Sequence, residues 1–284
     1  MMNSQLAPLE LHLPSNGPEL HPQRVRYPLR FRLLDVVTVD RLTPFLTRVT
    51  LGGADLDGFI SSGFDDHVKL FFPDPDTGIL NLPEVGPEGP VWGEGARPVM
   101  RDYTPRHFDA EGRTLAIDFA LHTPGGPATR WAEQARVGQK IGVGGPKGSF
   151  IVPTAFDWHL LIGDDTALPA IARRLEELPP ATKALVLLEV EGPEGQMELS
   201  SAADLKVQWV HRGSSAAGSQ PLLAALREMT LLPGVFYSWV ACESVQAKAL
   251  REYLMIECRV NPRWIKASGY WRKGSAGAHD SFDR

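Results

Sequence analysis

The hydrophobic pattern of this chain changes near residue 153, and the change limits the folds that the sequence can adopt. Before it, short β-branched and aromatic runs alternate with Gly, Pro and Asp, a pattern typical of antiparallel strands. Six strands of this kind predict a small barrel. We predict them at 30–39, 45–51, 67–72, 101–105, 113–121 and 140–145.

After residue 153, apolar strands alternate with segments of helical periodicity. Strands are predicted at 158–163, 183–190, 206–210 and 236–241, and helices at 167–178, 220–229 and 244–258. This alternation implies a parallel sheet, whose ligands bind at the carboxyl ends of the strands. The predicted fold class is β + α/β: an N-terminal antiparallel six-stranded barrel followed by a parallel-sheet α/β nucleotide-binding domain.

The same patterns predict the domain boundaries. Residues 1–24 have several prolines and no periodicity, so we expect a flexible arm. The barrel domain is expected over 25–152 and the α/β domain over 153–274. Residues 275–284 are expected to form a C-terminal tail.

Two segments of the predicted barrel carry the chemistry of a cofactor site. Arg-Asp-Tyr-Thr-Pro at 101–105 offers a cation, an aromatic face and a hydroxyl, which can hold a pyrophosphate, flank a ring and hydrogen-bond its reactive nitrogen. Residues 122–131 form a Gly-rich turn that opens into a helix, where free N–H groups bind phosphate. Alone, each segment is also typical of an ordinary strand or turn. Together they indicate a flavin site.

Composition and motifs argue against several other classes. The formal net charge of -5 does not favour a nucleic-acid binder. The sequence has no hydrolase or P-loop motif, and its histidines show no metal-ligand spacing, so no metal site is expected. Cys242 and Cys258 fit a reducing compartment, and the apolar runs are too short to cross a membrane. We therefore expect a cytoplasmic protein, and a monomer because no heptad pattern is present.

An ordered set of motifs resembles one known family. The chain is similar to the siderophore-interacting proteins, ferric-siderophore reductases of the ferredoxin-reductase-like flavoprotein superfamily, over residues 26–274. The resemblance rests on the motifs at 66–73, 81–83, 101–105, 118–122, 125–132, 163–171 and 267–272.

The resemblance implies that FAD binds mainly to the barrel and extends toward the second domain. Arg101 would contact the pyrophosphate. Tyr103 and Thr104 would be the catalytic pair, Tyr103 packing on the flavin and Thr104 hydrogen-bonding near its N5. Trp271 would cover the adenine or isoalloxazine ring. The cofactor-binding residues implied in full are Arg101, Asp102, Tyr103, Thr104, Asp118, Phe119, His122, Gly126, Pro127, Ala128, Thr129, Thr166, Ala167 and Trp271.

The resemblance also implies the reaction. NADPH or NADH would deliver hydride to flavin N5, and the flavin would pass electrons singly to the Fe(III) of a siderophore. Because Fe(II) is a softer, less charged ion, the chelator would then release it. Five cations are expected to bind the ferric siderophore: Lys69, Arg130, Lys266, Arg272 and Lys273.

Several alternatives stay open at this point. The enzyme could receive electrons from a ferredoxin, act as a general flavin reductase, or bind siderophores without turnover. Arg212 could meet the 2′-phosphate of NADPH, whereas Glu189 and Glu191 could favour the ribose diol of NADH. The sequence favours NADPH slightly.

Overall fold

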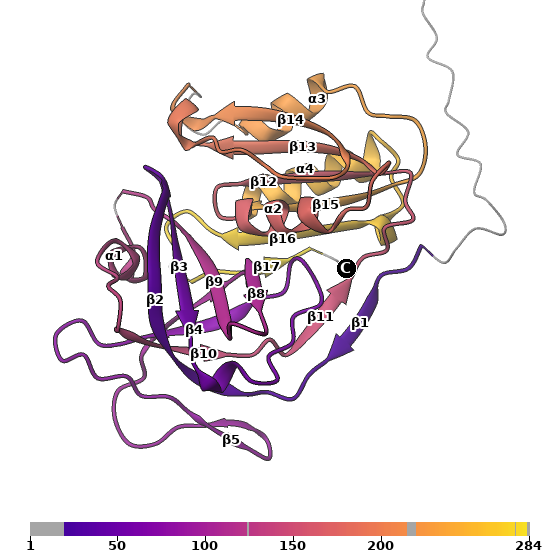
Figure 1. The fold of residues 1–284 in the computed structure, drawn as a ribbon. Helices are drawn as coiled ribbons and strands as arrows, with labels where there is room; N and C mark the ends of the chain where they lie inside the picture. The colour runs from indigo at the N-terminus through magenta and orange to yellow at the C-terminus, as the bar shows by residue number, and fades with distance from the viewer. Residues whose placement is uncertain (1–19, 124, 215–219, 276, 283–284) are drawn as a thin grey trace, which may run out of the picture.

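The computed structural model describes residues 20–123, 125–214, 220–275 and 277–282. Two large sheets lie one above the other. The last strands of the C-terminal sheet face the N-terminal sheet (Figure 1). The N-terminal half of the chain forms the antiparallel sheet, and the C-terminal half forms the mostly parallel sheet.

The antiparallel sheet curls around a buried apolar core in which Leu34, Val49, Ile117 and Ile141 have no exposed surface. Its strand order is β7-β4-β10-β2-β3-β9-β8. The strands are β2 (Phe31–Thr43), β3 (Leu46–Gly52), β4 (Val68–Phe72), β7 (Val99–Tyr103), β8 (His107–Asp109), β9 (Thr114–Ala120) and β10 (Lys140–Gly144).

All six predicted strands are present in this sheet, but the count of six is not confirmed. The seventh strand, β8, pairs with the amino-terminal half of β9 at the sheet edge. Its three residues are too few to show the alternation by which a strand is recognised.

The second sheet has the order β14-β13-β12-β15-β16-β17, in which β17 alone is antiparallel to its neighbour. Because the order reverses beside β12, a crevice for ligands is expected at the carboxyl ends of β12 and β15. The strands are β12 (Trp158–Asp164), β13 (Lys183–Val190), β14 (Asp204–His211), β15 (Phe236–Glu243), β16 (Ile265–Trp271) and β17 (Asp280–Ser281). The helices are α2 (Leu168–Glu177), α3 (Pro221–Glu228) and α4 (Ser244–Ile256).

The predicted strands and helices of this half are all present, and β16 is an addition. Lys266, Ser268 and Gly269 interrupt its apolar run, so the sequence does not show a continuous buried strand. Gly269 is required because a Cβ there would lie 2.2 Å from Ser244 Oγ.

Shorter elements complete the fold. They are α1 (Pro127–Glu133), the strand pairs β1 (Gln23–Arg26) with β11 (Gly148–Ile151) and β5 (Glu84–Gly86) with β6 (Gly89–Val91), and the 3-10 turns η1 (Ala54–Leu56), η2 (Pro193–Gly195), η3 (Arg212–Ser214) and η4 (Pro262–Trp264). Residues 1–19 of the expected arm lie outside the described residues, and Gln23 and Arg24 belong to β1. The expected tail contains β17.

A shared hydrophobic cluster joins the two halves. Phe64, from the segment before β4, packs with its ring centroid 5.4 Å from that of Trp239 on β15. The indole N–H of Trp239 donates to Asp65 Oδ2 at 3.0 Å. Among the described residues, no helix is long and apolar enough to span a bilayer.

Candidate functional site

The first predicted cofactor segment lies on β7, at an edge of the antiparallel sheet. Successive side chains of a strand point to opposite faces, so Arg101 and Tyr103 share one face and Asp102 lies on the other. Arg101 is half-buried, and its Nη1 donates to the carbonyl of Met100 at 2.7 Å. A planar guanidinium held in this way matches the geometry of a pyrophosphate.

The adjacent Tyr103 and Thr104 bring this strand to the junction between the two domains. The Tyr103 ring centroid lies 4.5 Å from that of Phe119. Burial raises the pKa of Tyr103, against the opposing charge of Arg101, so its phenol is neutral. The buried Thr104 side chain lies beside Tyr270, which comes from β16 of the other domain.

The second cofactor segment is the turn that leads into α1. His122 Nε2 lies 3.4 Å from Thr129 Oγ1, and Gly126 is the residue that caps the helix. Among the residues that the structure describes, a Cβ built on Gly126 would meet no atom within 4 Å, so the turn faces open space. Helix geometry leaves the N–H groups of Ala128 and Thr129 without intrahelical acceptors. Pro127 is the first residue of the helix, where its missing N–H costs nothing.

Two of the predicted cofactor residues have side chains that stabilise the barrel. Asp118 accepts two hydrogen bonds from Arg48, at 2.7 and 2.8 Å, and lies 3.9 Å from Arg106. Phe119 has no exposed surface and packs between Tyr103 and Trp131. A contact of either residue with a cofactor would therefore have to come from the backbone.

The carboxyl end of β12 supplies the predicted residues of the second domain. The backbone N–H and the hydroxyl of Thr166 donate to Asp164 Oδ1, at 3.0 and 2.5 Å. The indole N–H of Trp271 donates to Asp164 Oδ2 at 2.7 Å, which places Trp271 over this turn. Burial, reinforced by Asp165, raises the pKa of Asp164 to about 7. Ala167 is fully buried, so it can face a ligand only through its backbone.

Each of four predicted substrate cations has its own partner in the described chain. Lys69 Nζ lies 2.6 Å from Asp102 Oδ1, Lys266 Nζ lies 2.6 Å from Asp65 Oδ2, Arg272 Nη2 lies 2.7 Å from Asp280 Oδ2, and Arg130 Nη1 donates to Gly125 O at 2.7 Å. The side chain of Lys273 is exposed.

Two histidines that the sequence did not single out connect these ion pairs. The His279 ring centroid lies 6.2 Å from that of His67 and 5.9 Å from that of Tyr270. Burial and the nearby His67 lower the pKa of His279, whereas the charges of Asp102 and Asp280 act to raise it. Lys266 also lowers this pKa, and Asp102 and Asp280 are the partners of Lys69 and Arg272, so three of the predicted substrate cations lie near His279. No sequence motif contains His279, which lies in the segment expected to form the C-terminal tail.

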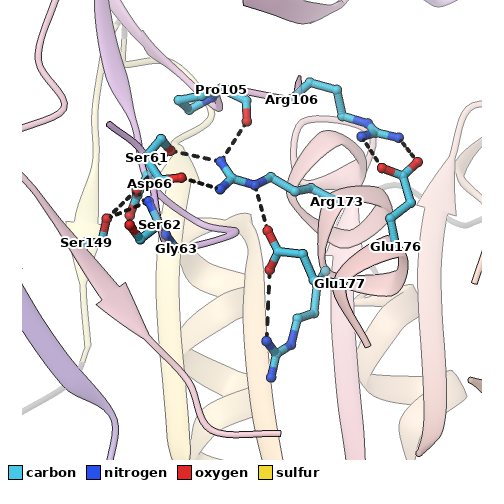
Figure 2. Close-up of polar contacts among 11 residues, drawn as sticks. Ser61, Ser62, Gly63, Asp66, Pro105, Arg106, Ser149, Arg173, Glu176 and Glu177 are labelled. Atoms are coloured by element: carbon cyan, nitrogen blue, oxygen red, sulfur yellow. Dashed lines mark hydrogen bonds and ion pairs between the residues drawn. The ribbon is translucent and has the colours of Figure 1, made fainter. Parts of the chain in front are cut away.

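A second group of contacts, the α2 clasp, fixes the two domains beside the candidate site (Figure 2). It consists of Arg173 and Glu176 on α2 with Ser61, Pro105 and Arg106 of the barrel domain. Arg173 donates to Ser61 Oγ and Pro105 O at 2.9 Å and to Ser61 O at 2.8 Å, and Arg106 forms a bidentate ion pair with Glu176. Pro105 follows the predicted catalytic Thr104, so the clasp sets the position of that residue.

Arg212, the candidate for 2′-phosphate recognition, is surrounded by carboxylates. Its guanidinium lies 2.8 Å from Glu189, 3.1 Å from Asp165 and 3.3 Å from Glu191. Burial alone would lower the pKa of Arg212, but Asp165 and Glu189 outweigh burial and raise it. The cation and the acidic groups that the sequence treated as alternatives thus form one cluster, at the carboxyl ends of β12, β13 and β14.

The residues present fit FAD. The open space at Gly126, the two N–H groups of the first turn of α1 and the guanidinium of Arg101 are suited to phosphate oxygens. The Tyr103 ring and the Thr104 hydroxyl offer a face and a hydrogen-bonding group for the flavin. Nothing in this donor set conflicts with the cofactor.

Comparisons with known proteins identify the family of this chain. The family model described as the siderophore-interacting FAD-binding domain matches residues 35–150, and the model described as the siderophore-interacting protein matches residues 156–274. The NADPH-dependent ferric-chelate reductase of Escherichia coli (strain K12) is 40% identical over 261 residues, covering 90% of this chain and 98% of that protein.

Solved structures show the same relationship. A siderophore utilization protein from T. fusca has a TM-score of 0.84 at 39% identity, covering 90% of this chain and 98% of that one. The ferredoxin reductase of carbazole 1,9a-dioxygenase, at 17% identity and a TM-score of 0.60 over 84% of this chain and 67% of that one, shares the fold alone. The sequence match and the two-domain structure together show that this chain belongs to the siderophore-interacting protein family, with an FAD-binding barrel domain.

Proposed function

We propose that this protein uses FAD to reduce Fe(III)-siderophores and thereby release Fe(II), with NADPH as the electron donor. The observation that carries the proposal is the junction at which the His279 ring packs between His67 of the barrel domain and Tyr270 of β16, beside the ion pairs of Lys69, Lys266 and Arg272. A flavin edge and an anionic iron chelate can approach each other there. The family and the relative named as an NADPH-dependent ferric-chelate reductase support the same reading.

The barrel residues hold and orient the cofactor in this proposal. Arg101 and the turn of His122, Gly126 and Thr129 bind the phosphates, and Tyr103 packs against the ring. Bound FAD supplies the conversion of a two-electron donor into single electrons for iron. Thr104 contributes a hydrogen bond to the reactive edge, and its contact with Tyr270 keeps it in place.

The second domain presents the electron donor. Trp271 is 36% exposed and donates to Asp164, which is 1% exposed, so it covers the carboxyl end of β12. Thr166 closes the same turn through its two hydrogen bonds to Asp164. Arg212 is proposed to meet the 2′-phosphate of NADPH, in competition with its carboxylate partners.

The substrate is held by charge instead of by metal ligands from the protein. Lys69, Lys266 and Arg272 attract an anionic chelate, while Arg130 and Lys273 add positive charge outside the group around His279. The iron stays bound to its chelator until its reduction weakens the hard oxygen ligation. We also propose a cytoplasmic monomer, for which size-exclusion chromatography with light scattering is the direct test of oligomeric state.

An anaerobic absorbance experiment tests the proposed function. NADPH or NADH is added to FAD-loaded protein, followed by a ferric siderophore and a ferrous trap. NADPH is expected to bleach the flavin band, and the siderophore is expected to restore it with formation of the trap colour. Free FAD without protein is the control. Reduction by neither nucleotide would point to a ferredoxin donor, which reduced ferredoxin tests directly. Bleaching without any siderophore response would leave a general flavin reductase, and siderophore binding without flavin reduction would leave a binding protein.

Thr104→Val sharpens the same experiment. Loss of one hydrogen bond at the reactive edge is expected to slow flavin bleaching about tenfold. This corresponds to an increase of about 1.4 kcal/mol in the activation free energy. The affinity for FAD should change much less. Equal bleaching rates in the variant and the wild type would remove Thr104 from the reaction.

A further inference from the structure

The last described residues form a strap across the mouth of the candidate site. We name residues 277–282 the C-terminal strap. It is anchored at its far end, where β17 pairs with β16 and the N–H of Phe282 donates to Ala267 O at 3.0 Å. Phe282 also packs against the hydrophobic cluster that contains Leu250 of α4. The strap is therefore attached to the second domain.

The near end of the strap reaches the barrel domain. A Cβ built on Gly277 would lie 3.5 Å from Arg101 Nη1, and its φ of +68° is a left-handed conformation that favours glycine. His279 places its ring between His67 and Tyr270, one from each domain. The strap thus crosses the junction at which the proposed reaction takes place.

Asp280 is the charged contact between the strap and the substrate cations. Its Oδ2 accepts from Arg272 Nη2 at 2.7 Å and from Ser244 Oγ at 2.6 Å. The hydrogen bond from Ser244, with the charge of Arg272, lowers the pKa of Asp280, so it is a carboxylate at neutral pH. The side chains of Arg272 and Asp280 are 52% and 29% exposed, so an anion from solvent can compete for this pair.

The surroundings of the strap reinforce this competition. His279, adjacent to Asp280, has its ring centroid 6.2 Å from that of His67, and the charges of Asp102 and Lys266 influence its pKa. Lys69 on β4 is paired with Asp102, and Lys266 on β16 is paired with Asp65. A chelate that enters must exchange these carboxylates for its own negative oxygens.

We propose that Asp280 is a specificity-determining residue of the ferric-chelate site. Its carboxylate occupies the anion position on Arg272, and the substrate must displace it. Because the ion pair must be broken before a chelate can contact Arg272, the Asp280 carboxylate lowers the affinity for a strongly anionic chelate, such as a trianionic tris-catecholate, more than that for a neutral tris-hydroxamate, which gains little from Arg272. The inference rests on the proposed function, and it states that the charge of the chelate affects its affinity for that site.

A binding experiment with redox-inert gallium(III) separates this inference from turnover. Isothermal titration calorimetry measures the Kd of Ga(III) tris-catecholate and Ga(III) tris-hydroxamate for FAD-loaded wild type and Asp280→Asn. The asparagine keeps the size of the side chain and an oxygen that can accept from Ser244. We expect the variant to bind the tris-catecholate roughly threefold to fivefold more tightly, the range for an exposed ion pair, with a smaller change for the tris-hydroxamate.

Two controls distinguish the charge effect from a change of fold. Asp204→Asn removes an exposed carboxylate at the amino end of β14, away from the site, and should leave both Kd values unchanged. In an Arg272→Gln background, Asp280→Asn should have no further effect, because the cation for which the carboxylate competes is gone. Far-UV circular dichroism and the flavin spectrum check that each variant is folded and loaded.

The possible outcomes either support the proposal or overturn it. Tighter tris-catecholate binding by Asp280→Asn that disappears in the Arg272→Gln background supports it. Equal or weaker binding by the variant, or the same change in both backgrounds, overturns the role of Asp280 while leaving the proposed substrate site intact. If the wild type binds neither gallium chelate, the substrate site itself is wrong.

Discussion

The α2 clasp and the C-terminal strap both connect the two domains, but they do so by different physical means. In the clasp, Arg173 is 13% exposed and donates three hydrogen bonds to Ser61 and Pro105. In the strap, Gly277 and His279 reach Arg101 and His67 of the barrel domain. The adjacent ion pair of Arg272 and Asp280, within the second domain, is open to solvent. A buried charge that satisfies backbone carbonyls is costly to remove, whereas an exposed pair exchanges with water and ions at little cost.

This difference assigns separate tasks to the two contacts. The clasp sets the relative position of the domains and of the segment that contains Thr104. The strap can open without loss of that arrangement, because its partners lie at the mouth. The buried charges thus hold the two domains together, and the exposed charges lie where a ligand from solvent can reach them.

Replacing the clasp arginine is expected to have the largest effect on stability. Arg173→Met keeps much of the apolar stem but leaves Ser61 O and Pro105 O without their charged donor. We expect the free energy of unfolding in urea to fall by about 2–4 kcal/mol. Glu177→Gln is the matched control, because Glu177 binds the same guanidinium from a 36% exposed position and should cost less than about 1 kcal/mol. A similar loss in both variants would mean that the clasp is no stronger than a surface ion pair.

A buried histidine of the second domain predicts that the free energy of unfolding falls at acid pH. His159 on β12 is fully buried beside Phe156, and among the described residues neither of its ring nitrogens has a hydrogen-bond partner. Burial, followed by the charge of Arg174, lowers its pKa to about 3. The unfolded chain binds a proton below its ordinary pKa of 6.5, whereas the folded chain does not, so stability is lost as the pH falls from about 6.5 toward 3.

His159→Leu tests this titration. At pH 5 the wild type should have lost about 2 kcal/mol relative to pH 8, and the variant should lack that part of the loss. Urea unfolding at the two pH values measures the difference. If the variant and the wild type lose the same free energy between pH 8 and pH 5, His159 is not the titrating group.

The exposed rim of the clasp is expected to give the smallest change. The hydrogen bond from Arg106 is the main cause of the lowered pKa of Glu176, whose side chain is 40% exposed. Its contribution is present above the ordinary pKa of 4.5 and is lost as the pH falls through the lower folded value. Glu176→Gln should therefore cost less than about 1 kcal/mol at pH 7, and the cost should shrink as the pH falls below the ordinary pKa of 4.5 toward 3. An undiminished cost at pH 3 would show that packing, not charge, is responsible.

The sequence predicted the regions whose structure depends on local pattern. The strands of both sheets and the helices α2, α3 and α4 follow from apolar periodicity and turn residues, because each buries one continuous face. It missed β8 and β17, which are too short to carry a pattern, and β16, in which Lys266 and Gly269 interrupt the apolar run.

The candidate site was predictable only where a motif marks it. Arg101, Tyr103 and Thr104 could be named because their order along one strand is distinctive. The clasp and the strap depend on contacts between residues far apart in sequence, such as Arg173 with Ser61 and His279 with His67. No local signal identifies such pairs. The sequence also could not show that Asp118 forms an ion pair with Arg48.

Hydrogen exchange compares the clasp and the strap most directly. On FAD-loaded protein, mass spectrometry follows a peptide covering residues 61–66, whose amides of Ser62 and Gly63 are bonded to Ser149 and Asp66, and a peptide covering the strap. We predict that the strap amides exchange on the order of a hundredfold or more faster, because local opening of the strap leaves the core intact. Equal protection of the two peptides would contradict the account, because the strap would then open only when the whole protein unfolds.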